Sequence, residues 1–237
     1  MATTAMFLLK PFKTAASITS SLTGFNSNYN KLAFLHTASL HSHNDYKVIR
    51  YIKDIKNNNT NTILLHAGQD IPDETGSLTY DASFKGVNDI PEITGEYQII
   101  NKGSLRTGVI SAKPGENNVI QKINRLSAYL KKEKNCNVVV CLSQLGFKNK
   151  NTTDDITLAE QSTHLDIIIS GHAQNFQKNP YIALNSNKGE VIIHSAAGDT
   201  TAFGKIEIDF NEYGQKKHIS FINTLSDTTT NQAIPAA

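Results

Sequence analysis

The chain has few cysteines, little net charge and no long apolar run, and each scarcity excludes a class of protein. Two cysteines among 237 residues support neither a disulfide framework nor a cysteine-based zinc site. Cys136 and Cys141 flank a short apolar run that directs their side chains poorly for a mutual bridge, so we expect free thiols. The formal net charge of +2 is spread over interspersed acids and bases, which excludes a basic nucleic-acid groove. No apolar run is long enough to span a bilayer.

Two catalytic signatures are also missing. No serine stands in a G-x-S-x-G turn, which presents the nucleophile in α/β hydrolases. No G-x-x-x-x-G-K-[ST] phosphate-binding loop occurs either. A chance pair such as Ser39 with His41 would still need an orienting third group and an oxyanion hole, and no residue pattern nominates them.

The first 30 residues differ from the rest of the chain. They are rich in small residues and contain an apolar cluster at residues 6–9, two lysines and no acid. In a secretory signal the basic residues precede the apolar core, whereas Lys10 and Lys13 follow it here. Residues 1–30 are therefore interpreted either as the remnant of an export signal or as a tail, and residues 227–237 as a C-terminal tail.

From residue 31 the hydrophobic pattern becomes regular and predicts one α/β domain over residues 31–226. Short apolar runs predict buried strands at 32–36, 62–65, 138–142 and 166–170. Residues 97–101 and 104–112 predict a hairpin, and further strands are expected at 181–184, 191–194, 203–210 and 218–225. Helical spacing marks residues 48–56, 119–130 and 154–161. The first strand–helix–strand unit favours a parallel pair, and residues 68–96 show no period and predict a loop.

Polar side chains follow four of the predicted buried strands. The four loops span residues 35–43, 65–70, 142–146 and 170–175, and they are rich in His, Gln, Asn and Ser. Asp70 is the one acid at these loop tips. Because sites in such folds gather at the carboxyl ends of the strands, we expect a polar cleft with imidazoles there.

Taken in order, these loops resemble the metal-binding loops of the calcineurin-like metallophosphoesterases, in their 5'-nucleotidase branch. That branch has approximately H-T-N-D-x-H, then G-D followed by Gly-Ser, then G-N-H-E/D, S-H-L-G and G-H-x-H. The corresponding segments here are His36-Thr37-Ala38-Ser39-Leu40-His41, Gly68-Gln69 with Gly76-Ser77, Ser143-Gln144-Leu145-Gly146 and Gly171-His172-Ala173-Gln174. The similarity covers about residues 31–210 and implies an αββα sandwich of two mixed sheets flanked by helices.

The ligand positions depart from that pattern. The resemblance places the family's metal-binding acids at Ser39 and Gln69, and it places two of its imidazoles at Gln144 and Gln174. The Asn-His loop has no counterpart, because the segment from Gln69 to Tyr97 is short and contains no histidine. Of the ligand set that the resemblance implies, only His41 and His172 remain.

This loss bears directly on mechanism. Two divalent ions a few ångströms apart repel each other, so a dinuclear site needs carboxylates between and around them. Amides and hydroxyls supply no negative charge. Without the metals nothing activates the attacking water or neutralises the phosphoryl oxygens. We therefore expect a pseudoenzyme that has lost dinuclear metal binding and phosphoester hydrolysis, with no metal cofactor or at most one Zn²⁺ or Mn²⁺.

Two alternatives stay open. One is a phosphoester hydrolase with a single ion, in which His41, His43 and His172 meet near Asp45 or Asp70, with His66 as a further candidate. The other is a module that binds phosphate or a nucleotide without cleaving it. The simpler interpretation is that these histidines are ordinary loop residues and bind no metal. Asp199 follows another predicted strand and is most simply interpreted as a turn residue.

The resemblance also implies surroundings for the domain. Many 5'-nucleotidases carry a second domain that binds the base, so we expect that a separate chain with such a C-terminal-type domain completes the assembly. Bacterial relatives are usually exported, which implies a periplasmic or cell-surface location. Neither a nucleic-acid partner nor a membrane span is expected.

Overall fold

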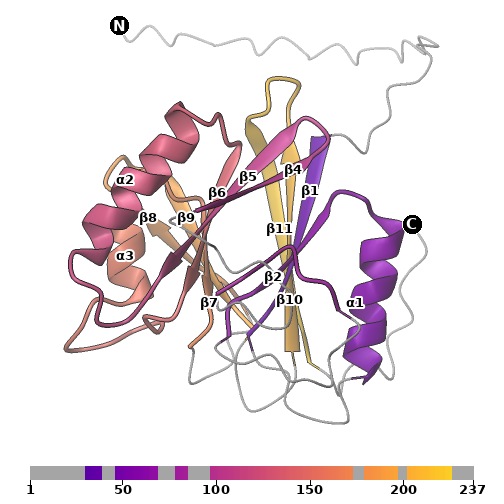
Figure 1. The fold of residues 1–237 in the computed structure, drawn as a ribbon, viewed down its shortest axis with the longest axis horizontal. Helices are drawn as coiled ribbons and strands as arrows, with labels where there is room; N and C mark the ends of the chain where they lie inside the picture. Colours follow the sequence, from indigo (N-terminus) through magenta and orange to yellow (C-terminus); the bar gives the residue numbers. More distant parts are fainter. Residues whose placement is uncertain are drawn as a thin grey trace, which may run out of the picture.

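The computed structural model describes residues 30–38, 46–68, 78–84, 97–172, 179–196 and 202–225. Within these ranges the chain forms two β-sheets that pack face to face, with helices on the outer sides of both (Figure 1). None of the helices in this part of the chain combines the length and the apolar character that crossing a membrane requires.

The first sheet takes its strands from both ends of the chain, in the order β11-β10-β1-β2-β3. These strands are β1 (Lys31–Thr37), β2 (Thr62–His66), β3 (Ala82–Ser83), β10 (Ala202–Phe210) and β11 (Lys216–Leu225). β1 and β2 are parallel and are joined through α1 (Tyr46–Asn58), as the strand–helix–strand pattern predicts. β10 runs antiparallel to both β1 and β11.

The second sheet comes from the middle of the chain, in the order β4-β5-β6-β7-β9-β8. Its strands are β4 (Gln98–Lys102), β5 (Leu105–Ala112), β6 (Val138–Ser143), β7 (Ile167–Ser170), β8 (Tyr181–Leu184) and β9 (Glu190–Ser195). The four inner strands are parallel, and β4 and β8 are antiparallel strands at the edges. Both sheets are therefore mixed, as expected.

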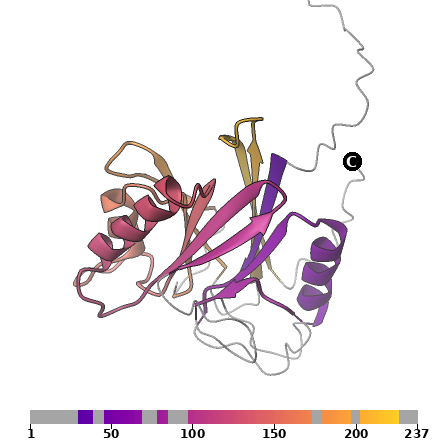
Figure 2. The ribbon, with the colours of Figure 1, turned by 45° about the horizontal axis from the view of Figure 1, so that its top comes forward.

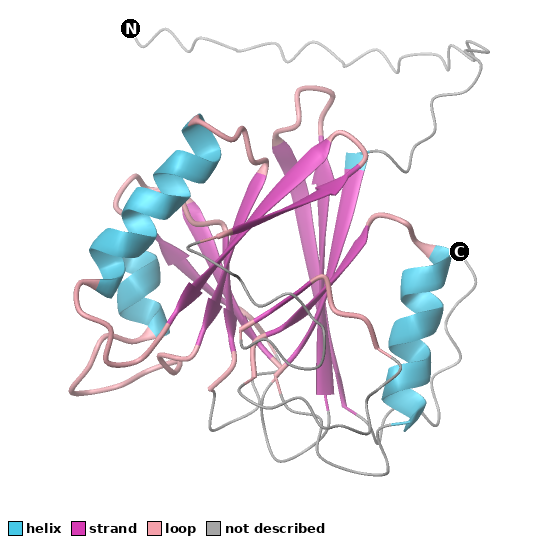
Figure 3. Ribbon diagram, in the orientation of Figure 1, coloured by secondary structure: helices cyan, strands magenta, loops and turns pink. Residues whose placement is uncertain are grey.

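Alternation along the strands divides the core into layers. In β6, Val138, Val140 and Leu142 face the other sheet, whereas Val139 and Cys141 face the helices α2 (Val119–Lys132) and α3 (Asp155–Gln161). An equivalent apolar cluster lies between α1 and the outer face of the first sheet. The result is the predicted αββα sandwich, seen in Figure 3 as two layers of strands between helices and again, tilted, in Figure 2.

Local sequence signals agree with most of these elements. Helix α3 begins as predicted, because the Asp154 side chain accepts a hydrogen bond from the Thr157 backbone N–H and so caps the first turn. Both cysteines are free and buried, as expected. The prediction that residues 68–96 form only a loop is wrong at β3, a two-residue strand paired with the end of β2.

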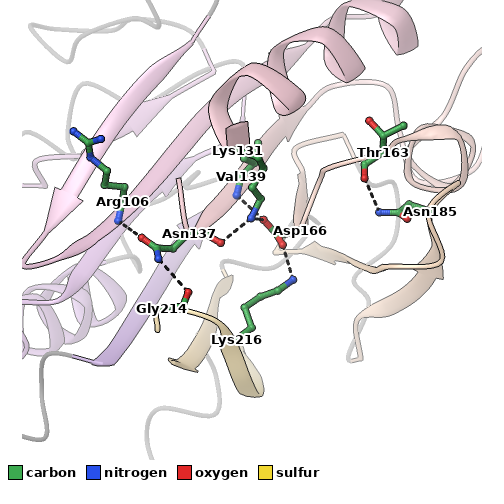
Figure 4. Close-up of polar contacts among 9 residues, drawn as sticks. All are labelled: Arg106, Lys131, Asn137, Val139, Thr163, Asp166, Asn185, Gly214 and Lys216. Atoms are coloured by element: carbon green, nitrogen blue, oxygen red, sulfur yellow. Dashed lines mark hydrogen bonds and ion pairs between the residues drawn. The ribbon is translucent and has the colours of Figure 1, made fainter. Parts of the chain in front are cut away.

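At the amino ends of β6 and β7 a polar clasp joins the two sheets (Figure 4). Asp166 accepts a hydrogen bond from the Val139 N–H at 2.7 Å and pairs with Lys131 on α2 at 2.6 Å. It also reaches Lys216 of the first sheet at 2.5 Å. Beside it, Asn137 donates to the Gly214 carbonyl oxygen in the β10–β11 turn at 3.1 Å. Charge and hydrogen bonds thus fix this end of the sandwich.

Candidate functional site at the carboxyl ends of the strands

The carboxyl ends of the two sheets meet, as the sequence predicts for a site. Gln144 follows β6 and is buried, and its Nε2 donates a hydrogen bond to the Ala67 carbonyl oxygen just after β2. Gly171, after β7, lies so close that an added Cβ would overlap the same oxygen. The backbone can approach this closely only because residue 171 has no side chain.

Gln144 therefore makes a cross-sheet contact at one of the positions that the resemblance assigns to an imidazole. Its Nε2 is directed at a backbone carbonyl. Its Oε1 is buried and has no hydrogen-bond partner among the described residues. The side chain thus contributes a donor that is already engaged and one free neutral oxygen.

His172 lies at the same edge, two residues beyond the end of β7, and is exposed. Its backbone oxygen is close to Gly146 of the loop after β6, where an added Cβ would lie 3.5 Å away. The other proposed ligand, His41, lies outside the described residues, as do Ser39, Gln69 and Gln174. His43, Asp45, Asp70 and Asp199 also lie outside them. The structure thus places Gln144 and His172 at one edge and leaves the rest of the set as predictions.

His66, a further candidate, is buried in a hydrogen-bonded chain at the end of the first sheet. Its Nδ1 is 2.8 Å from the Thr37 hydroxyl, which lies 3.0 Å from the Tyr80 hydroxyl. The His66 and Tyr80 rings are also in contact, with centroids 5.3 Å apart. These contacts connect β1, β2 and the segment before β3, and they engage the Nδ1 side of the His66 ring.

A second pair of imidazoles was not predicted from the sequence. His36 of β1 and His194 of β9 point inward from opposite sheets, and His36 Nε2 is 2.5 Å from His194 Nδ1. Burial and the nearby His194 hold the pKa of His36 well below its ordinary value. Burial lowers the pKa of His194 to about 4. Both rings are therefore neutral at pH 7, when one donates and the other accepts.

A buried carboxyl group was likewise missed as a site feature. Asp155, the first residue of α3, accepts hydrogen bonds from the Ser143 and Ser170 hydroxyls at the ends of β6 and β7. Burial raises its pKa to about 6, although the two hydroxyls favour the ionised form. The sequence shows the two acids, Asp154 and Asp155, at the start of this helix, but it does not show that Asp155 is fully buried.

The described residues do not assemble a metal site on their own. Nowhere in the described ranges do three or more His, Cys, Asp or Glu side chains gather in a way that could hold a metal ion. The predicted ligand positions outside those ranges are not covered by this finding.

Comparison with known proteins supports the fold. No family model matches the sequence, and no curated protein matches it. Among solved structures, a 5'-nucleotidase precursor from Thermus thermophilus is similar, with a TM-score of 0.63 and 15% identity over 82% of this chain. NAD nucleotidase (NadN) of Haemophilus influenzae gives a TM-score of 0.67 and 14% identity over 82% of the chain. The sulfate thiohydrolase SoxB of Thermus thermophilus gives a TM-score of 0.54 and 18% identity over 77% of the chain.

These likenesses define the class of fold: an αββα sandwich of the metallophosphoesterase type. The particular structures that it resembles are 5'-nucleotidases and their relatives, as the loop motifs had indicated. The match covers 54% of the Thermus nucleotidase, 56% of NadN and 42% of SoxB, so this chain spans about half the length of these proteins.

Proposed function

We propose that this chain is a degenerate, 5'-nucleotidase-like metallophosphatase domain that acts as a pseudoenzyme. The observation that carries the proposal is the contact between Gln144 and the Ala67 carbonyl oxygen. In this contact the side chain at a predicted ligand position forms a hydrogen bond between the two sheets. In this proposal the scaffold has lost its dinuclear metals and uses the edge at the strand ends for binding or for partner contact.

Electrostatics supports this choice over dinuclear hydrolysis. A pair of divalent ions needs several negative ligands, and neutral amide oxygens bind Zn²⁺ and Mn²⁺ weakly. The fully buried acid Asp155 directs its carboxylate at Ser143 and Ser170. Its two oxygens are therefore engaged with these hydroxyls and are not available as ligands for an ion at the strand ends.

A hydrolase with one Zn²⁺ or Mn²⁺ is the second candidate, favoured by the exposure of His172 at this edge. His41 would be its natural companion ligand. A module that holds phosphate or a nucleotide without cleaving it uses the same cleft and needs no metal.

We also propose that a separate chain completes the assembly. The solved 5'-nucleotidase and NadN extend well beyond the part that this chain matches, which supports a partner with the remaining domain. An export-like pattern in residues 1–30 supports a periplasmic or cell-surface location. Fractionation of the native source and pull-down of the tagged chain test these two points, and a cytoplasmic, partner-free protein contradicts both.

Metal content is the decisive measurement for the site. The purified chain is incubated with Mn²⁺ and Zn²⁺, freed of unbound ions, and analysed for metal per chain. We expect none bound, and two ions per chain would overturn the proposal. One bound ion per chain that is lost in His172→Ala would establish the mononuclear alternative. The control is His218→Ala, which removes an exposed histidine on β11 and should keep the ion.

Thermal stability in phosphate or nucleotides then separates the two metal-free functions. A ligand that binds only the folded state must raise its stability. An increase in Tm identifies a binding module, and an unchanged Tm leaves partner contact as the function.

A further inference from the structure

Asp155 joins the two strand ends that carry Gln144 and His172. Its side chain is fully buried, and its two carboxylate oxygens accept from different serines. Ser143 is the last residue of β6 and Ser170 is the last residue of β7, with Ser170 Oγ 2.5 Å from Asp155 Oδ2. The two serines are neighbours in the β6–β7 pairing, and one carboxyl group is therefore hydrogen-bonded to the residue from which each loop starts.

The backbone around Asp155 extends this connection into the loops themselves. The Asp155 N–H donates to the Gly146 carbonyl oxygen at 2.9 Å. Ser143 Oγ accepts a hydrogen bond from the Leu145 N–H at 3.2 Å while it donates to Asp155. The Ser143 carbonyl oxygen accepts from the Gly171 N–H at 2.7 Å. A change at the carboxyl group thus has a direct route to the residues on either side of Gln144.

No cation compensates the charge of Asp155 within ion-pair distance in the described part of the chain. The charged group that acts on it is Asp154, whose own carboxylate accepts from backbone N–H groups, while burial keeps the Cys141 thiol on β6 neutral. Lys122 on α2 is paired with Glu116 at 2.5 Å. The two serine hydroxyls are therefore the main partners of the carboxylate.

Protonation must alter this arrangement, because of the number of available hydrogens. The ionised carboxylate accepts from both hydroxyls. The neutral acid carries an O–H of its own, so one serine must turn to accept it and the hydrogen of that serine loses its partner. Buried polar groups seldom stay unpaired, so the loop that carries that serine readjusts.

We propose that Asp155 is a positioning residue that sets Gln144 and His172 relative to each other, and that its protonation switches the loops between two arrangements. This inference goes beyond the proposed function, because it holds whether or not the cleft binds a metal. Burial raises the pKa of Asp155 to about 6, which places the switch about one pH unit below neutrality.

The test is a titration of the folded chain between pH 5 and 7, followed by two-dimensional ¹H–¹⁵N NMR. We expect the Leu145 backbone amide and the Gln144 side-chain amide to shift with a midpoint near pH 6. Asp155→Asn abolishes this transition, whereas Asp209→Asn, which removes an exposed carboxyl group on β10, leaves it intact. His172→Gln also leaves it intact, which assigns the transition to the carboxyl group rather than to the neighbouring loop residue.

The inference is overturned if these amides do not respond to pH or if they respond equally in Asp155→Asn. Should that variant fail to fold, Ser170→Ala gives the answer. It removes one donor that favours the ionised form, so it must move the midpoint to higher pH. An unchanged or lower midpoint in Ser170→Ala would contradict the role of Asp155.

Discussion

Removal of the Asp166 side chain tests the polar clasp between the two sheets. Only 8% of this side chain is exposed, and it serves a backbone N–H and two lysines (Figure 4). In Asp166→Ala the buried Val139 N–H loses its acceptor, and Lys131 and Lys216 lose their counter-charge. Breaking one partner of a buried pair costs about 3–5 kcal/mol, and the exposed parts of the two lysines place this case near ~3 kcal/mol.

The assay is urea denaturation at neutral pH. We expect the urea concentration at the unfolding midpoint to fall, while the slope of the unfolding free energy against urea concentration stays the same. Asp209→Ala is the matched control, since Asp209 is 40% exposed and lies 3.6 Å from Lys31. Such a surface pair contributes less than about 1 kcal/mol. Equal losses in the two variants would refute the reasoning, as would a loss below ~1 kcal/mol for Asp166→Ala.

Two further predictions concern the imidazole pair between the sheets. The pKa of His194 is about 4 in the folded chain against 6.5 for a free histidine, so the unfolded chain binds the proton first as the pH falls. Stability is therefore full above pH 6.5 and decreases by up to about 3 kcal/mol by pH 4. In His194→Gln the free energy of unfolding should fall less between pH 7 and pH 4.5 than in the wild type, as measured by denaturation at both pH values. An identical pH dependence in the two proteins would contradict this. Asp155, with its raised pKa, acts in the opposite sense, so the comparison is made between variants rather than on the wild type alone. In Gly204→Ala the new Cβ would overlap the His36 ring and lie 2.8 Å from His194 Cε1, so we expect a loss of about 1–3 kcal/mol by thermal denaturation. Gly189→Ala should cost less, because the nearest atom to its Cβ would be Asn185 Nδ2 at 3.2 Å.

Most of the architecture was predictable because it depends on short-range patterns. The apolar runs at 138–142 and 166–170 are too short for helices and too apolar for exposed strands, and they are β6 and β7. Helix α2 follows from apolar residues at helical spacing. The loop motifs added the sandwich topology, which periodicity alone does not specify.

The features that were missed depend on tertiary contacts. β3 has only two residues and is a strand only because it pairs with β2. His36 and His194 lie 158 positions apart, and no local pattern connects them. Asp155 looked like an ordinary acid at a helix start, because the two serines that enclose it come from separate strands.

The candidate site was predicted only in part. Its location at the strand ends and the place of Gln144 and His172 follow from the order of the motifs. The hydrogen bond from Gln144 to Ala67 did not, because an amide in a loop has many local acceptors and only the packed sheets select one.

The composition of the two sheets has a consequence for synthesis on the ribosome. The second sheet uses one continuous stretch, so all its strands are available before the last part of the chain emerges. In the first sheet, β1 pairs with β10, from the opposite end of the chain. Until β10 and β11 leave the ribosome, β1 has an open edge, through which nascent chains aggregate or recruit chaperones. β1 therefore gains its second partner strand last, and a truncation before β10 leaves that edge unpaired.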